Sequence, residues 1–273
     1  MELWGVDFTC APSVRKPITV ARGRWRDSGD AVVVELLRID ELRTLEAFDA
    51  LLLDAGPWFA AFDLPFGLPR MFVDELGLGS NADAVIAELH RRCGSSRMAF
   101  RAVIDGWTNG RPAGQRLVHR RTDRTRFGVS STSPLQSRYV PVAFMYFEAM
   151  HRLVQADVTL PRLRRGRRGA IGVEGYPGLL AHELIGTRSY KNGDDAARRA
   201  ARREIVERLL LGDHRLGVPL AIEAKQRRTL IDDAAGDRLD AALCLVQAAW
   251  CARRRGAGAP RGVDPVEGWI ATT

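Results

Sequence analysis

Acidic side chains interrupt several otherwise apolar segments of the chain at or near their ends. Asp7 and Asp63 each lie near the end of a short apolar run, and Glu174 lies in a third. Asp237 and Asp240 stand in the first turn of a strongly apolar helical segment, three residues apart and so on one face. A carboxylate among apolar residues is costly unless it is paired, hydrogen-bonded or bound to a metal ion.

Carboxylates that converge favour a divalent cation. They repel one another and raise one another's pKa unless a cation neutralises them. An all-oxygen ligand set suits Mg²⁺ or Mn²⁺, and a pair of such ions supports hydrolysis of phosphodiesters. A cap or turn role is the alternative for any single acid, above all for the one that begins the helix. We expect metal ligands at Asp7, Asp63, Glu174 and Asp240, all four also catalytic, with Asp237 a further catalytic candidate.

The first 69 residues predict three strands, a helix and a fourth strand. The strands are expected at 3–9, 18–25, 31–39 and 58–64, with a hairpin turn at 27–30 and a helix over 40–54 capped by Asp40. A buried strand after a crossover helix is typical of parallel pairing. Ligands bind beyond the carboxyl ends of parallel strands, so Asp7 and Asp63 converge if their strands are neighbours.

The remainder of the chain predicts an insertion and then a return to the sheet. From 70 to 168 we expect helices near 82–92 and 142–156 around an irregular stretch from 94 to 138, closed by the arginine tract 162–168. A fifth strand over 170–176 follows. Helices are then expected over 177–185, 194–211 and 237–255.

The chain is basic, with 41 Lys+Arg against 33 Asp+Glu and a formal net charge of +8. Only three of these cations are lysines, and many of the arginines lie in 94–138 and 162–168. Guanidinium groups suit phosphate oxygens, although solvated loops with internal ion pairs, or a codon bias toward arginine, explain the same excess. The substrate-phosphate candidates are Arg120, Arg124, Arg188 and Lys191.

Composition excludes several other classes of protein. A chain of 273 residues with 46% hydrophobic residues can bury a core without disulfides or structural zinc, and its four cysteines form no CxxC pair. No apolar run reaches the ~18 residues of a membrane span, and no basic segment leads into an apolar signal sequence. We expect a cytoplasmic protein with free thiols and no membrane partner.

Four phrases resemble one protein family. They are Gly5-Val6-Asp7-Phe8-Thr9, Asp63-Leu64-Pro65-Phe66-Gly67-Leu68-Pro69, Glu174-Gly175-Tyr176-Pro177-Gly178 and Gly236-Asp237-Arg238-Leu239-Asp240-Ala241. The chain is similar nearly end to end to the domain-of-unknown-function family numbered 429, described as predicted nucleases with a ribonuclease H fold. The resemblance implies an α/β fold with a ribonuclease H-like mixed five-stranded sheet flanked by helices.

The resemblance also implies one domain over 1–273, with a core of 1–69 and 169–273. The mostly helical or irregular insertion of about 70–168, between the fourth and fifth strands, departs from better-known ribonuclease H enzymes. We expect a Mg²⁺- or Mn²⁺-dependent nuclease acting on DNA or RNA. A noncatalytic nucleic-acid-binding module, or a phosphohydrolase or phosphotransferase acting on a small phosphorylated substrate, is the alternative.

Overall fold

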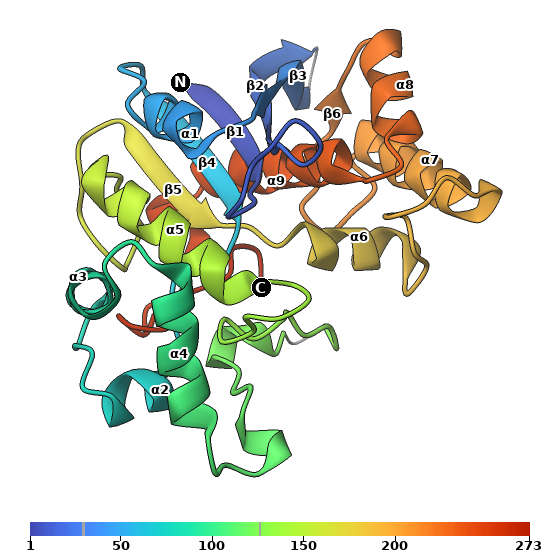
Figure 1. The fold of residues 1–273 in the computed structure, drawn as a ribbon. Helices are drawn as coiled ribbons and strands as arrows, with labels where there is room; N and C mark the ends of the chain where they lie inside the picture. Colours follow the sequence, from blue (N-terminus) through green and yellow to red (C-terminus); the bar gives the residue numbers. More distant parts are fainter. Residues whose placement is uncertain (29–30, 126) are drawn as a thin grey trace.

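The computed structural model describes residues 1–28, 31–125 and 127–273, which form an α/β fold (Figure 1). A six-stranded mixed sheet runs in the order β5-β4-β1-β2-β3-β6. The pairs β1–β4, β4–β5 and β3–β6 are parallel, and β1–β2 and β2–β3 are antiparallel. The strands are β1 (Glu2–Asp7), β2 (Ile18–Ser28), β3 (Ala31–Leu42), β4 (Trp58–Asp63), β5 (Ala170–Glu174) and β6 (Leu220–Ala221).

The sheet has one strand more than the five that were predicted. The extra strand, β6, is two residues long and pairs with Val34 and Glu35 of β3, and a strand this short has no periodicity to read. The prediction that Asp40 caps a helix is also wrong. Strand β3 continues to Leu42 and Thr44 caps the helix that follows, while Asp40 accepts a 2.7 Å hydrogen bond from Arg22. Residues 29–30 of the predicted turn lie outside the described residues.

Nine α-helices of the described chain flank the sheet. The stretch 94–138, predicted to be irregular, contains α4, because Ser96 caps it and Phe100, Ile104 and Trp107 recur at helical spacing. Helices α2 and α8 were not predicted. The helices are α1 (Leu45–Leu52), α2 (Arg70–Glu75), α3 (Ala82–Cys93), α4 (Arg97–Thr108), α5 (Val142–Gln155), α6 (Pro177–Ile185), α7 (Ala196–Leu211), α8 (Ala224–Asp232) and α9 (Asp237–Ala252).

Two apolar cores lie on opposite faces of the sheet. One face packs against α1 and the helices α3, α4 and α5, and the other against α6, α7, α8 and α9; Figure 1 shows α5 and α9 on opposite sides. Side chains alternate between the faces along each strand. In β4, for example, Phe62 belongs to the first core and Phe59 and Ala61 to the second.

The arginine tract 162–168 is partly docked on the body of the protein. Arg164 forms ion pairs with Asp83 and Asp157 at 2.8 and 3.2 Å, and Arg167 donates to the backbone carbonyls of Leu52 and Asp54. These two arginines therefore hold the segment that leads into β5.

The four cysteines are free thiols, as predicted, and all four are buried. Among the helices that the structure describes, none combines the length and the apolar character needed to cross a bilayer.

Candidate metal site at the end of the sheet

The carboxyl ends of β1 and β4 place two acids side by side. These neighbouring strands are parallel, and Asp7 is the direct register partner of Asp63. By alternation, Asp63 shares the face of Phe59 and Ala61, which pack in the core around α9. The parallel strands that the sequence predicted therefore bring their two acids together on the α9 side.

Helix α9 can approach this strand end because β1 has a glycine there. A Cβ on Gly5 would lie 2.0 Å from the carbonyl oxygen of Ala241 and 2.1 Å from the amide nitrogen of Leu245, both backbone atoms of α9. The helix backbone thus rests directly on β1. This contact places the first turn of α9, with Asp240, beside Asp7.

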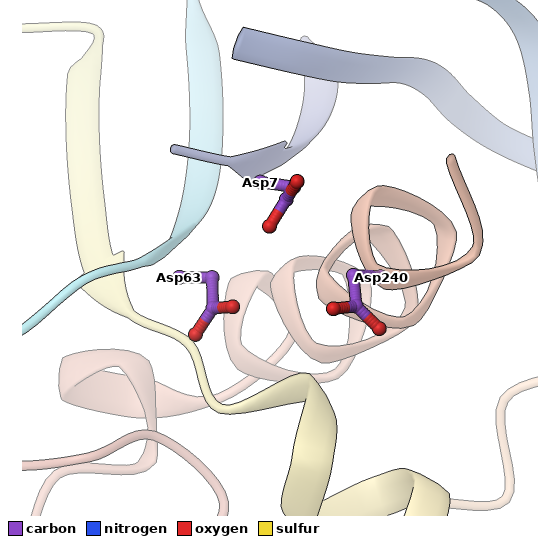
Figure 2. A group of neighbouring side chains, drawn as sticks. All are labelled: Asp7, Asp63 and Asp240. Atoms are coloured by element: carbon purple, nitrogen blue, oxygen red, sulfur yellow. The ribbon is translucent and has the colours of Figure 1, made fainter. Parts of the chain in front are cut away.

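The three carboxylates form one acidic cluster, Asp7, Asp63 and Asp240 (Figure 2). One oxygen from each can be chosen so that all three lie within 4.8 Å of one another. Asp240 is fully buried and Asp7 is 8% exposed, whereas Asp63 is only half-buried. Three carboxylate oxygens at this spacing are a donor set that Mg²⁺ and Mn²⁺ prefer.

Two lysines and a tyrosine contact the acids of this helix turn, Asp240 and Asp237. Lys191 forms an ion pair with Asp240 Oδ2, and Tyr190 donates a 2.6 Å hydrogen bond to Asp240 Oδ1. Lys16 lies 2.7 Å from Asp237 Oδ1. Two of the chain's three lysines therefore lie at the site, where their charges offset those of the acids.

The electrostatics of the cluster favour a cation. Burial, together with the charges of Asp63 and Asp237, raises the pKa of Asp7 to about 8, although Lys191 and Lys16 act in the opposite direction. Burial also raises the pKa of Asp63. The lysines therefore compensate the acids only in part, and a further positive charge at the cluster would be stabilised.

A buried arginine holds the loop that carries Tyr190 and Lys191. Arg202 of α7 is fully buried and donates to the carbonyls of Tyr190 and Gly193, both at 2.9 Å, and to that of Ile231 at 2.7 Å. These bonds join the loop between α6 and α7 to the end of α8. Arg202 thus positions Lys191 without touching Asp7, Asp63 or Asp240.

Glu174 lies on the other face of the sheet. Its register partner in β4 is Phe62 rather than Asp63, so alternation directs it toward the core that includes Phe62. The residue one step further is Gly175, where a Cβ would lie 3.1 Å from the sulfur of Cys244. The acidic cluster found among the described residues therefore does not include Glu174.

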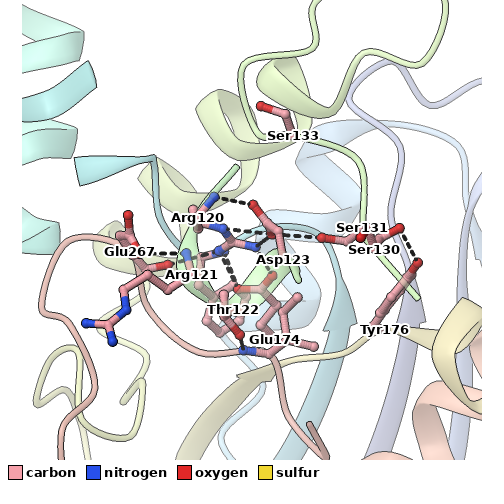
Figure 3. A network of polar contacts seen from close by, with 12 residues as sticks. Arg120, Arg121, Thr122, Asp123, Ser130, Ser131, Ser133, Glu174, Tyr176 and Glu267 are labelled. Atoms are coloured by element: carbon pink, nitrogen blue, oxygen red, sulfur yellow. Dashed lines mark hydrogen bonds and ion pairs between the residues drawn. The ribbon is translucent and has the colours of Figure 1, made fainter. Parts of the chain in front are cut away.

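Arg120 meets Glu174 in a buried ion pair that joins four segments of the chain (Figure 3). Its two terminal nitrogens lie 2.5 and 2.8 Å from the Glu174 carboxylate oxygens. Its other bonds go to Asp123 and to the carbonyl of Glu267, so that all five guanidinium N–H groups are used. Glu174 also accepts from the amide of Phe66 at 2.9 Å.

One of the predicted phosphate-binding residues, Arg120, is the centre of this network. Arg120 is 2% exposed and has no donor left for a substrate in this arrangement. Its partners explain the burial: the negative charges of Glu174 and Asp123 raise the pKa of Arg120, although burial alone would lower it. Arg120 therefore fastens the region 70–168 to the end of β5.

The other predicted residues lie in different places. Asp237 is one turn before Asp240 and pairs with Lys16. Arg188 forms an exposed ion pair with Glu204 at 2.8 Å, and Arg124 is exposed; Arg126 of the same stretch lies outside the described residues. Of the four phosphate candidates, only Lys191 contacts the acidic cluster in the described part of the chain.

Lys16 is a site residue that sequence reasoning missed. It lies in the loop after β1, beside Ser13, whose backbone amide donates to the Lys16 carbonyl. The signal that was available is its residue type. In a chain with 41 Lys+Arg, lysine occurs three times, and two of the three are at the acids.

One comparison with known proteins identifies the family. A family model described as "Protein of unknown function (DUF429)" matches residues 5–265, which is nearly the whole chain. The chain belongs to this family. The matched range of this DUF429 protein includes Asp7, Asp63 and Asp240 together with Lys16 and Lys191. No curated protein and no solved structure matches the chain significantly.

Proposed function

We propose that this DUF429 protein is a Mg²⁺- or Mn²⁺-dependent nuclease that hydrolyses phosphodiester bonds. One observation carries the proposal: Asp7, Asp63 and Asp240, from two parallel strands and a helix, bring carboxylate oxygens within 4.8 Å of one another at the carboxyl end of the sheet. If the three carboxylates had only a structural role, the two lysines would compensate their mutual repulsion only in part.

The order of the strands supports a ribonuclease H-like core. Strands β3, β2, β1, β4 and β5 are successive neighbours, and β2 alone runs against the others. The two strand acids of the cluster, Asp7 and Asp63, stand on the first and fourth strands. The third stands in α9, near the end of the chain, as the resemblance implies.

Each residue has a proposed part. The three carboxylates would hold the cation, which would supply Lewis-acid polarisation of the phosphate and activation of water. Lys16 and Lys191, whose side chains are 54% and 35% exposed, are placed to contact phosphate oxygens at the open side of the cluster. Tyr190 orients the Asp240 carboxylate by its hydrogen bond.

Metal binding is tested first, without any substrate. Calorimetric titration of Mn²⁺ should give binding to the wild type and a loss of at least tenfold in affinity for Asp7→Asn and Asp240→Asn. The matched control is Asp74→Asn, because Asp74 is an exposed carboxylate of α2 with one long 3.5 Å ion pair. Equal, negligible binding by all four proteins would refute the metal site.

The chemistry is tested with labelled single-stranded and double-stranded DNA and RNA. Cleavage should require Mg²⁺ or Mn²⁺ and should be lost in both cluster variants but kept in Asp74→Asn. A binding module would instead retain salt-dependent binding of nucleic acid with no cleavage by the wild type. A small-molecule phosphohydrolase would release phosphate from mononucleotides and leave the polymers intact.

A further inference from the structure

A cavity of about 200 Å³ opens beside Asp63, between the sheet core and the region 70–168. Asp63 belongs both to the acidic cluster and to the wall of this cavity. One wall comes from the turn after β4 and from Tyr176, and the other from the segment that leads into α5, including Val140 and Val142. The cavity thus begins where the acidic cluster ends.

The size and lining of this cavity fit one flat ring system. Pockets for drug-sized ligands measure roughly 300–1,000 Å³, so a cavity of about 200 Å³ admits a smaller group. About half of its lining residues are apolar, among them Leu64, Val142, Met145 and Ile270. Tyr176 offers an aromatic ring, and its hydroxyl is held by the carbonyl of Ser130 at 3.1 Å, which restrains the side chain.

The charges around the cavity disfavour a phosphate. Arg120 is its cationic lining residue, and all of its donors are used by Glu174, Asp123 and the Glu267 carbonyl. Asp63 and Glu174 also line the cavity, so its lining holds two carboxylates and one arginine, and the donors of that arginine are already used. A neutral ring with an apolar face meets this environment better than an anion does.

We propose that this cavity binds a single unpaired nucleobase, whose own or neighbouring phosphate lies at the acidic cluster. The inference rests on the proposed function, which places a phosphodiester at Asp63. A base inside a duplex is stacked and paired and cannot enter a cavity of this kind, so the substrate is single-stranded or locally unpaired nucleic acid. The region 70–168 supplies half of the cavity and so takes part in substrate choice.

Neutral nucleosides test the cavity without metal or catalysis. In buffer containing a chelator, saturation-transfer NMR with adenosine, guanosine, cytidine and uridine should show stronger saturation of base protons than of ribose protons for at least one nucleoside. Ribose alone should give no signal. Equal saturation of base and ribose protons, or no signal from any nucleoside, would overturn the proposal.

A pair of substitutions on α5 locates the binding. Val142→Trp fills the cavity and should reduce nucleoside binding at least tenfold. Phe144→Trp is the matched control, because Phe144 is also half-buried in the first turns of α5 but is not among the lining residues. Circular dichroism and Mn²⁺ titration show whether each variant is folded with its acidic cluster intact. A folded Val142→Trp protein that binds nucleosides like the wild type would refute the location.

Cleavage assays separate this inference from the proposed function. If both are correct, Val142→Trp loses cleavage of single strands while Mn²⁺ affinity is unchanged. If nucleosides bind but no polymer is cut, the cavity stands and the nuclease proposal fails. If Val142→Trp cuts single strands as fast as the wild type, the nuclease proposal stands and the cavity has no part in it.

Discussion

Replacing Gly5 by alanine tests whether the contact between β1 and α9 builds the acidic cluster. The added Cβ would lie 2.0 Å from the Ala241 oxygen, whereas ordinary contact begins near 3.4 Å, so the helix must retreat by about 1.4 Å. The close atoms are all backbone, and no side-chain rotation can relieve the clash. Overpacking of this kind costs about 3 kcal/mol of unfolding free energy.

The same displacement moves Asp240, which directly precedes Ala241. Metal–ligand distances tolerate only about 0.2 Å, so Mn²⁺ affinity should fall by at least about tenfold. Under the proposed function, cleavage should fall by about 10²-fold, as expected for a misplacement near 1 Å. Urea denaturation measures the stability and calorimetry measures the metal affinity.

Gly106→Ala is the matched control for this experiment. Gly106 lies inside α4, and a Cβ added to it would meet nothing within 4 Å. Alanine there should raise the unfolding free energy by about 0.5–1 kcal/mol. A Gly5→Ala protein whose unfolding free energy and Mn²⁺ affinity both match the wild type would refute the contact as described.

Three further predictions concern charged groups. Without metal, Asp7→Asn should raise the unfolding free energy at pH 7 by about 1–3 kcal/mol, because the raised pKa of Asp7 makes its ionisation unfavourable in the folded state, and the gain should grow as pH rises toward 8. Glu174→Gln should lower the unfolding free energy by about 3 kcal/mol, since Arg120 would lose one of its two buried carboxylate partners and keep only Asp123. Urea titrations of both variants check this, and the same sign for both would contradict it. Arg202→Met should cost about 2–4 kcal/mol by leaving three backbone carbonyls without a donor, and hydrogen exchange should accelerate in 186–195; Arg202→Lys should restore only part of the protection. His90 and His151 stack with ring centroids 3.8 Å apart. Burial lowers the pKa of both histidines, and the charge of Arg152 lowers both further. The Phe147 carbonyl and Glu148 act in the opposite direction on the pKa of His90. The unfolded state then binds more protons than the folded state. The unfolding free energy therefore has its full value above about pH 6.5 and falls as the pH drops toward 5. His151→Phe should make the urea midpoint depend less on pH across that range.

The acids of the cluster were predictable because each breaks an apolar pattern. Asp7 and Asp63 close runs that otherwise read as buried strands, and a crossover helix between such strands predicts that they are parallel. The position of Asp240 inside its helix argues against a plain cap. In each case a local pattern carried the information.

The place of Glu174 could not be predicted from the same pattern. Strand β5 is Ala-Ile-Gly-Val-Glu, an apolar run without polar alternation, so nothing in it reveals which residues face which core. A register shift of one residue moves a side chain to the opposite face. The pairing of Phe62 with Glu174 is a tertiary fact that depends on how β5 docks beside β4.

Arg120 was unpredictable for a related reason. It lies in a stretch with several other arginines, and residue type alone does not separate a buried guanidinium from solvated ones. Its partner Glu174 is 54 residues away, and contacts over such separations leave no local signal. Strand β6 was also unpredictable, because its two residues are too few to show a strand pattern.

The acidic cluster joins the first strand of the described chain to one of its last helices. Asp7 and Asp240 lie far apart in the sequence, and α9 contacts β1, β4 and β2 together. Contacts between distant parts of a chain form late in folding. A chain in which α9 has not yet docked therefore has the two strand carboxylates but lacks the third carboxylate of the cluster. Under the proposed function, such a partly folded chain could neither hold the cation nor cut nucleic acid.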